Sequence, residues 1–393
     1  MRKWLYLWLV ILLGTMSLLL TGCQFKDVDR RAFVLAFGID SVQKEEQGGQ
    51  GREEGEEGEG KGKDKGKGKH SIEVSLKLAI PEGDPTKRNQ EAIVISQISS
   101  SIPEAVRLLK SKVDKELDFS HCKTLLFGEA YARNNISEMT DWMVRRRDIQ
   151  LIAYNGVARP TAKEVLDVHP KSERVPAYYL ILSLGKEGTE SPFIVSTFSY
   201  NLRRHLTEQG LDPVLPLVEK AGEDTLLINK AVLLDNQRVR AELTPDEARM
   251  FNLLTQRGLR TSFNVEMDGN IYSYNMESNW SKFKLVKSNK GKMVVQYTVG
   301  GRATLEDNTD AIEMTGRILR AVSKAASEQW EKDIKQFLVK VHGTGVDPFG
   351  WGLRYSAMSW NNATELEEWK RIYPELEFSV KADVQVRYSG MIR

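Results

Sequence analysis

Apolar and polar residues alternate most regularly near the C-terminus, over residues 376–388 (LEFSVKADVQVRY). A period of two predicts a β-strand with one buried face. Further upstream, apolar residues from Ile312 to Val341 recur every third or fourth position, which is the spacing of an amphipathic helix packed on one side. We therefore predict that residues 301–393 form a C-terminal domain in which antiparallel strands pack against a long helix.

The preceding part of the chain shows shorter strand patterns. An apparent hairpin joins 228–234 to 239–243, and a helix begins at Thr244, where Pro245 and Glu247 complete a capping sequence. Four further strands are predicted at 261–267, 270–275, 281–285 and 293–300, the first two joined by the turn dipeptide Asp268-Gly269. These elements are assigned to a middle domain, residues 211–300.

The N-terminal portion, residues 23–210, reads as an α/β domain. A buried strand is predicted at 32–40, and a half-buried strand at 71–80, with Lys77 on its polar face. Between them lies a low-complexity insert, residues 43–70, whose composition predicts a disordered loop. Helices are expected from Ser101, 137 and Thr161, and strands at 123–127, 149–154 and 156–158. The chain is thus predicted to be multi-domain α+β, with mixed and antiparallel sheets flanked by helices.

The N-terminus has the pattern of an exported lipoprotein. Arg2 and Lys3 precede an apolar run at 4–20. The run ends in Leu20-Thr21-Gly22-Cys23, the lipobox order of an apolar residue, two small residues and a cysteine. We predict that 1–22 is a signal peptide, that cleavage falls between Gly22 and Cys23, and that Cys23 carries the lipid. A diacylated cysteine would hold the mature chain stably on the outer face of a membrane.

Charge and reactive residues exclude several functions. The chain has 56 Lys and Arg against 54 Asp and Glu, and this balance argues against nucleic-acid binding. None of the five histidines has a metal-ligand spacing, and His121 and Cys122 would point to opposite faces of a strand. We predict no catalytic, metal or cofactor site, and no enzymatic activity.

Two clusters are left with two interpretations each. Residues 145–148 (RRRD) are either a solvated helix end or a contact for a partner or lipid headgroups. The tryptophans of the last domain either pack in its core or form an exposed patch; they are Trp330, Trp351, Trp360 and Trp369.

Nearly the whole chain resembles the Ger(x)C family, the C subunits of nutrient germinant receptors of spore-forming Bacillus and Clostridium relatives. The resemblance rests on the order of these segments: Cys23, 29–40, 120–129, 147–151, 231–234, 243–244, the long helix, 347–352 (DPFGWG), Trp369, 373–374 and a terminal strand ending at Gly390. The sequence departs from the family at Gln24 and Phe25, where a tryptophan is usual, and in the insert.

The resemblance implies a three-domain α+β fold and a non-enzymatic receptor subunit on the outer face of the spore's inner membrane. Its implied partners are two integral-membrane subunits, and together they would trigger germination in response to nutrients. An alternative is a lipid-anchored solute-binding protein, which would need two similar lobes around a cleft.

Overall fold

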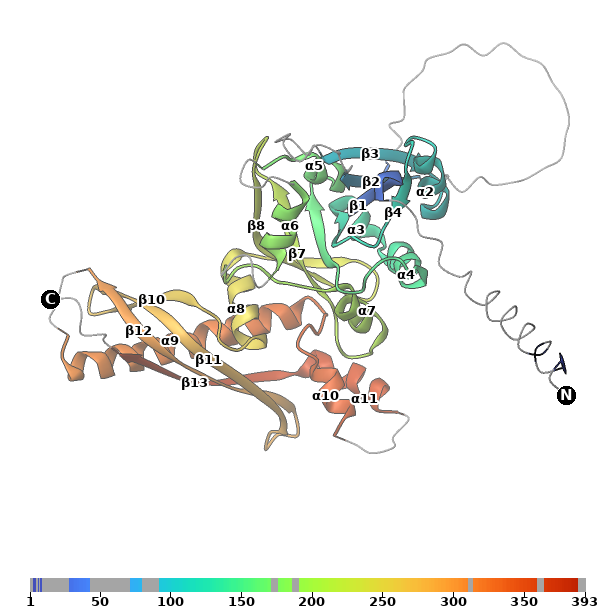
Figure 1. The fold of residues 1–393 in the computed structure, drawn as a ribbon. Coiled ribbons are helices and arrows are strands. Elements are labelled where there is room, and N and C mark those ends of the chain that lie inside the picture. Colours follow the sequence, from blue (N-terminus) through green and yellow to red (C-terminus); the bar gives the residue numbers. More distant parts are fainter. Residues whose placement is uncertain are drawn as a thin grey trace, which may run out of the picture.

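The computed structural model describes residues 28–42, 71–79, 92–170, 176–185, 191–309, 314–358 and 364–387, together with a few positions near residue 5. The predicted cleavage and lipidation site at Gly22 and Cys23 lies outside these residues, as does the insert 43–70. The described residues form two β-sheets, each covered by helices (Figure 1). The prediction of a multi-domain α+β fold with mixed sheets is confirmed.

The first sheet has the strand order β3-β2-β1-β5-β6-β7-β8-β9, and β4 also pairs with β1. Strands β1, β5, β6 and β7 run parallel, whereas β2, β3, β8 and β9 extend the sheet with antiparallel pairs. The bounds are β1 (Arg31–Ser41), β2 (Ile72–Ala79), β3 (Ala92–Ser99), β4 (Glu116–Asp118), β5 (Thr124–Gly128), β6 (Tyr154–Arg159), β7 (Val214–Lys220), β8 (Leu226–Leu234) and β9 (Val239–Leu243).

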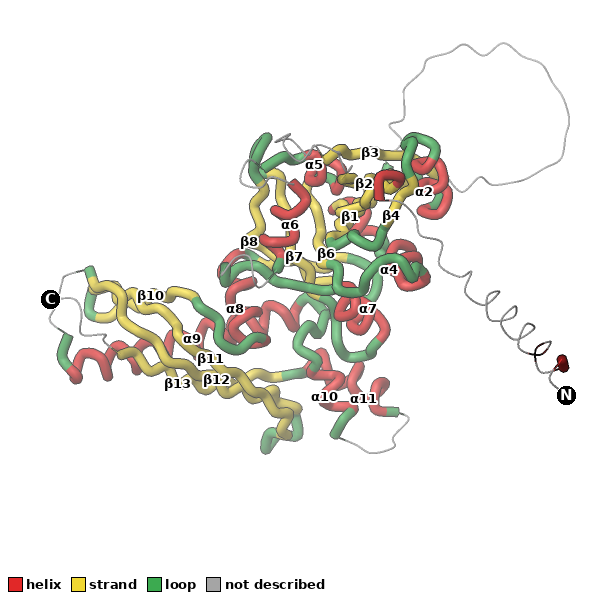
Figure 2. The backbone as a smooth tube through the Cα atoms, viewed as in Figure 1, coloured by secondary structure: helices red, strands yellow, loops and turns green. Residues whose placement is uncertain are grey.

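Helices cover both faces of this sheet (Figure 2). One core contains residues of α2 (Ile102–Lys110), α3 (Glu129–Asn134), α4 (Ser137–Arg145) and α7 (Ser199–Thr207). The other contains residues of α5 (Ala162–Asp167) and α6 (Pro176–Leu184). Successive residues of the central strands alternate between these cores: Leu125 and Phe127 face the first, and Leu126 faces the second. A parallel sheet needs cover of this kind because its strands are apolar on both faces.

Three N-terminal predictions need correction. The strand predicted at 149–154 is wrong, because residues 149–153 form turns and coil ahead of β6, which begins at Tyr154. Strand β2 is buried on both faces, and Lys77, expected on a solvated face, is 1% exposed. The reason is that α5 packs over the face that carries Lys77. The predicted capping box at Ser101 does not form either, because Glu104 accepts hydrogen bonds from the hydroxyls of Ser99 and Ser100 instead. The caps predicted at Thr161 and Thr244 are present.

The second sheet has the order β10-β11-β12-β13. Its strands are β10 (Thr261–Met267), β11 (Asn270–Lys287), β12 (Met293–Asn308) and β13 (Glu377–Arg387). The two strands predicted at 270–275 and 281–285 are one long strand, β11, with bulges in its pairing to β12. The strands of 211–300 divide between the two sheets, β7–β9 in the first and β10–β12 in the second. The exact domain boundaries stay a prediction.

The long helix is α9 (Gly316–Gly343), which runs along the second sheet in Figure 1. The expectation of purely antiparallel strands is wrong at the last one: β13 pairs parallel to β12, with Val294 opposite Glu377. Helix α9 is the reason, because it returns the chain to the end of the sheet where β12 began, and a crossover of this kind joins parallel strands. The remaining α-helices named for this part of the chain are α8 (Pro245–Thr255), α10 (Trp351–Ser356) and α11 (Glu365–Ile372), and the described residues also include two short 3-10 helices, η1 (Val28–Arg30) and η2 (Tyr373–Glu375).

The tryptophans of this region pack in the core. Trp330, Trp351 and Trp369 are buried, which confirms the packing interpretation for these three; Trp360 lies outside the described residues. The indole N–H of Trp330 donates to the hydroxyl of Tyr274, and that of Trp351 donates to Tyr297. Each buried polar atom of the two indoles is therefore satisfied, as burial requires.

Candidate functional site

The reactive residues considered in the sequence are not placed for catalysis. Cys122 is fully buried, and burial raises the pKa of its thiol to about 12. A thiol that stays protonated is a poor nucleophile. The neighbouring His121 is exposed and lies edge-on to the ring of Phe33, 4.9 Å between ring centroids. Among the described residues, no three histidine, cysteine or carboxylate side chains are grouped in a way that could hold a metal ion.

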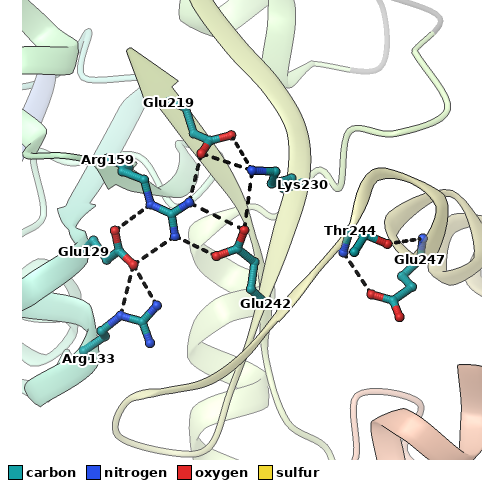
Figure 3. Close-up of polar contacts among 8 residues, drawn as sticks. All are labelled: Glu129, Arg133, Arg159, Glu219, Lys230, Glu242, Thr244 and Glu247. Atoms are coloured by element: carbon teal, nitrogen blue, oxygen red, sulfur yellow. Dashed lines mark hydrogen bonds and ion pairs between the residues drawn. The ribbon is translucent and has the colours of Figure 1, made fainter. Parts of the chain in front are cut away.

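A dense group of charges lies across the neighbouring strands β6, β7, β8 and β9 (Figure 3). Arg159 on β6 donates to Glu129 at the start of α3 (Nε to Oε2, 2.6 Å) and to Glu242 on β9 (Nη2 to Oε2, 2.6 Å). It also donates to Glu219 on β7 (Nη1 to Oε1, 2.9 Å), which forms an ion pair with Lys230 on β8. One guanidinium thus connects a helix to two strands of the sheet.

The electrostatics of this cluster favour its ionised form. The hydrogen bonds from Arg159 hold the pKa of Glu129 near about 2 and lower that of Glu242, and those same carboxylates raise the pKa of the guanidinium. Arg133 adds a second cation on the outer side of Glu129. Since each of the three carboxylates already has a cation, the cluster stabilises the sheet and offers no free charge for a ligand.

A second polar arrangement joins the two halves of the chain, and we call it the clasp: residues 209–213, which lead into β7, and residues 345–353, which follow α9. The main-chain N–H of Asp212 donates to the main-chain carbonyl of Asp347 (2.8 Å), and the N–H of Asp347 donates to Oδ2 of Asp212 (2.6 Å). A third bond runs from the N–H of Leu353 to the carbonyl of Gly210 (3.0 Å). The two segments are therefore held together by two main-chain to main-chain hydrogen bonds and one from a main-chain N–H to a carboxylate.

Glycines permit this close approach. A Cβ atom on Gly210, whose φ is +80°, would lie 2.6 Å from the main chain of Gly352. A Cβ atom on Gly352 would lie 2.4 Å from Nε1 of Trp369 and 2.8 Å from Cα of Gly210. Real Cβ atoms do not come this close to main-chain atoms, so both positions require glycine for the clasp to close.

The carboxylate of Asp347 is enclosed in the clasp, 3% exposed. Its Oδ2 accepts from the N–H of Gly352 (2.7 Å), and its Oδ1 accepts from that of Phe349 (3.3 Å). Burial nevertheless dominates and raises the pKa of Asp347 to about 7; burial also raises the pKa of Asp212. The clasp therefore contains a carboxyl group that changes charge near neutral pH.

A cavity of 290 Å³ lies beside the clasp. Trp369, Lys370 and Tyr373 line it, together with the two aspartates. Its volume is at the lower end of the range for small-molecule pockets, but both aspartates are already engaged by main-chain N–H groups. The clasp is best understood as the joint between the two sheets.

Sequence reasoning missed both arrangements, although one signal was available. Asp212 and Asp347 each precede a proline, and each follows a glycine within two residues. An aspartate before a proline, with a glycine nearby, marks a turn. A single sequence does not show, however, that two such turns contact each other in the fold. Nor does the residue order show that Arg159, Glu129, Glu219 and Glu242 converge.

The basic cluster 145–148 is partly paired: Arg146 forms an ion pair with Asp148 and lies over the ring of Phe119, 4.4 Å from its centroid.

Comparison with known proteins gives consistent matches. The family described as spore germination protein N-terminal domain matches residues 24–220, and the family described as spore germination B3/GerAC like, C-terminal, matches residues 229–390. The putative spore germination protein YfkR of Bacillus subtilis (strain 168) is 22% identical over 323 residues, covering 79% of this chain and 82% of that protein. Spore germination protein GerQC of Bacillus cereus is 20% identical over 294 residues, covering 73% and 80%.

A solved structure agrees with the fold. The crystal structure of the GerBC protein superposes with a TM-score of 0.52 at 15% sequence identity, covering 90% of this chain and 98% of that chain. At this identity the likeness concerns the fold alone. Because the two family matches together span most of the sequence, this chain belongs to the GerAC family of spore germination proteins, the C subunits of germinant receptors.

Proposed function

We propose that the mature chain is a non-enzymatic receptor subunit, anchored by a lipid on Cys23 to the extracytoplasmic face of the spore's inner membrane. There it assembles with two integral-membrane subunits, and the complex triggers germination in response to nutrients. The observation that carries the proposal is the lipobox at 20–23 ahead of a chain that belongs to the germinant-receptor family.

Three further observations support it. Within the described residues, no helix combines the length and the apolar character that a membrane crossing needs. Burial keeps the thiol of Cys122 protonated, and the charged cluster around Arg159 stabilises the first sheet. The two sheets also differ in strand number and order, which disfavours the two similar lobes of a solute-binding protein.

The lipid anchor can be tested with matched cysteine variants. Cys23→Ala should abolish or strongly weaken nutrient-triggered germination and leave germination by non-nutrient triggers intact, because the subunit would no longer be held at the membrane. Cys122→Ala is the control: it removes the other thiol, which is buried, and should leave the nutrient response in place. A normal nutrient response in Cys23→Ala spores would contradict the proposal.

The assembly can be tested by co-purification. The tagged chain, extracted from spores in detergent, should bring down two integral-membrane proteins, and mass analysis of its N-terminus should show an acylated Cys23. A chain that purifies alone, or one that retains residues 1–22, would refute the assignment to a membrane-bound complex.

A further inference from the structure

The chain enters the first sheet at the start of β1, and this side of the sheet forms a distinct surface. Strands β1, β5 and β6 run parallel, so their starting ends lie at the same edge. The segments that lead into these strands are 28–31, 118–123 and 145–153, and we call them together the entry edge. In Figure 1, β4 and α4 lie at this side of the sheet.

Side-chain contacts join the three segments into one surface. Arg31 forms an ion pair with Asp118 (2.8 Å), which connects the first segment to the second. The side-chain amide of Gln150 donates to the carbonyl of Ser120 (3.1 Å), which connects the second to the third. The guanidinium of Arg146 over Phe119 adds a further link.

The entry edge combines exposed apolar side chains with an excess of positive charge. Val28 is 52% exposed, Leu151 is 40% exposed and Ile152 is 53% exposed. The cations are Arg30, Arg31, Lys123, Arg145, Arg146 and Arg147, and the carboxylates are Asp29, Asp118 and Asp148. Arg31 and Arg146 are paired with Asp118 and Asp148, whereas Arg145 and Arg147 are exposed and have no ion pair within the described residues.

The length of the N-terminal tether decides what this surface faces. Five residue steps separate Cys23 from Val28, and a chain of that length spans at most about 17 Å. If Cys23 is lipidated, as proposed above, Val28 cannot leave the neighbourhood of the headgroup layer. The entry edge is then the part of the described protein nearest to the membrane.

We propose that the entry edge docks onto a membrane surface containing anionic lipids. Arg145 and Arg147 contact the headgroups, and Leu151 and Ile152 reach the boundary between headgroups and acyl chains. Basic residues near an anionic surface and apolar residues beside them are the combination that holds peripheral proteins on membranes. This docking fixes the orientation of the whole subunit relative to the membrane. A lipid anchor alone would leave the subunit free to rotate about its tether.

The mature lipidated protein allows a direct test, because Cys122 is buried with a raised thiol pKa and Cys23 is acylated. An environment-sensitive fluorophore on Ile152→Cys then labels the entry edge alone. The protein is incorporated into vesicles of phosphatidylglycerol mixed with phosphatidylcholine, or of phosphatidylcholine alone. We expect a blue-shifted emission, quenched by brominated acyl chains, on the mixed vesicles, and little of either on the neutral ones.

Two controls make the result specific. A label on Ile271→Cys, an exposed residue at the start of β11, should report water on both kinds of vesicle. Arg145→Glu with Arg147→Glu should lower the ratio of docked to undocked protein on mixed vesicles by at least about 25-fold, about fivefold for each arginine. The same reversal at Lys332 and Lys335, exposed on α9, should change it little.

The outcomes separate this proposal from the anchor on which it rests. Protein that fails to float with either kind of vesicle has no lipid, and the proposed anchor is then wrong. Protein that floats with both while the label at 152 reports water on both overturns the docking of the entry edge. A label that responds only when the integral-membrane subunits are present also overturns it, because the surface then contacts protein and not lipid.

Discussion

Replacing Asp347 by asparagine should make the protein more stable at neutral pH. In the unfolded chain this carboxyl titrates near pH 3.8, whereas in the clasp its pKa is about 7. At Asp347 the folded state therefore binds a proton more tightly than the unfolded state, so the contribution of this group to stability is largest below about pH 4 and falls as the pH rises to about 7. The difference of about three pKa units corresponds to roughly 4 kcal/mol.

The amide keeps most of the local hydrogen bonding. Its oxygen can accept from the N–H of Gly352, the shorter of the two bonds to Asp347, and the weaker bond from the N–H of Phe349 is lost. That loss costs about 1 kcal/mol. We therefore expect Asp347→Asn to be less stable than the wild type by about 1 kcal/mol at pH 4, and more stable by about 3 kcal/mol at pH 8.

The assay is urea unfolding of both proteins from pH 4 to pH 8, followed by tryptophan fluorescence. The matched control is Asp268→Asn, an exposed turn residue with φ of 54° that asparagine adopts readily. Its midpoint should track the wild type at every pH. If Asp347→Asn lowers stability equally at pH 4 and pH 8, then the carboxylate is ionised and held by its N–H donors, and the argument from burial fails.

Three further substitutions test the buried charges and the clasp. Burial lowers the pKa of Lys77 from 10.5 to about 8, so the free energy of unfolding of the wild type should rise between about pH 8 and pH 10.5, where the unfolded amine loses its proton. Lys77→Met should remove this rise in urea titrations. Arg159→Ala should lower the free energy of unfolding by about 2 to 4 kcal/mol in the same assay, because three carboxylates lose their shared cation. Salt at 1 M should reduce this loss. The control Arg133→Ala, which removes an exposed i,i+4 pair, should lower it by less than about 0.5 kcal/mol. Gly352→Ala should lower the free energy of unfolding by about 1 to 3 kcal/mol through steric overlap, whereas Gly316→Ala at the start of α9 should be neutral or stabilising; equal effects of the two alanines would contradict the packing argument.

The sequence predicted elements better than it predicted their directions. The alternation at 376–388 gave the strand β13 and its buried face, because side chains alternate along any strand. It could not show that β13 runs parallel to β12, since direction depends on where α9 delivers the chain. The apolar period of α9 likewise predicted a packed helix, and Trp330 and Val341 are indeed buried.

Burial on the second face of a strand was the other missed feature. The alternation at 71–80 predicts one solvent-exposed face, yet Lys77 lies under α5 and donates to the carbonyls of Leu166 (2.6 Å) and Val168 (3.0 Å). These carbonyls are at the C-terminal end of α5, where a helix leaves acceptors without partners and favours a cation. A lysine can occupy such a place only when the helix is already in position, and this information is tertiary.

Lys77 and Asp347 each lower stability over part of the pH range, and each of them, like the stabilising Arg159, fixes a defined geometry. An apolar residue at either of the first two positions would avoid the cost of burying a charge. Lys77 instead fixes the end of α5 on β2, Asp347 fixes the loop that joins the second sheet to the first, and Arg159 fixes α3 against β6 and β9. Each of these groups is satisfied by main-chain atoms or by a paired side chain, so none is left to bind a substrate. Charges placed in this way hold the elements around them in one relation, because they penalise every alternative packing in which their partners are lost.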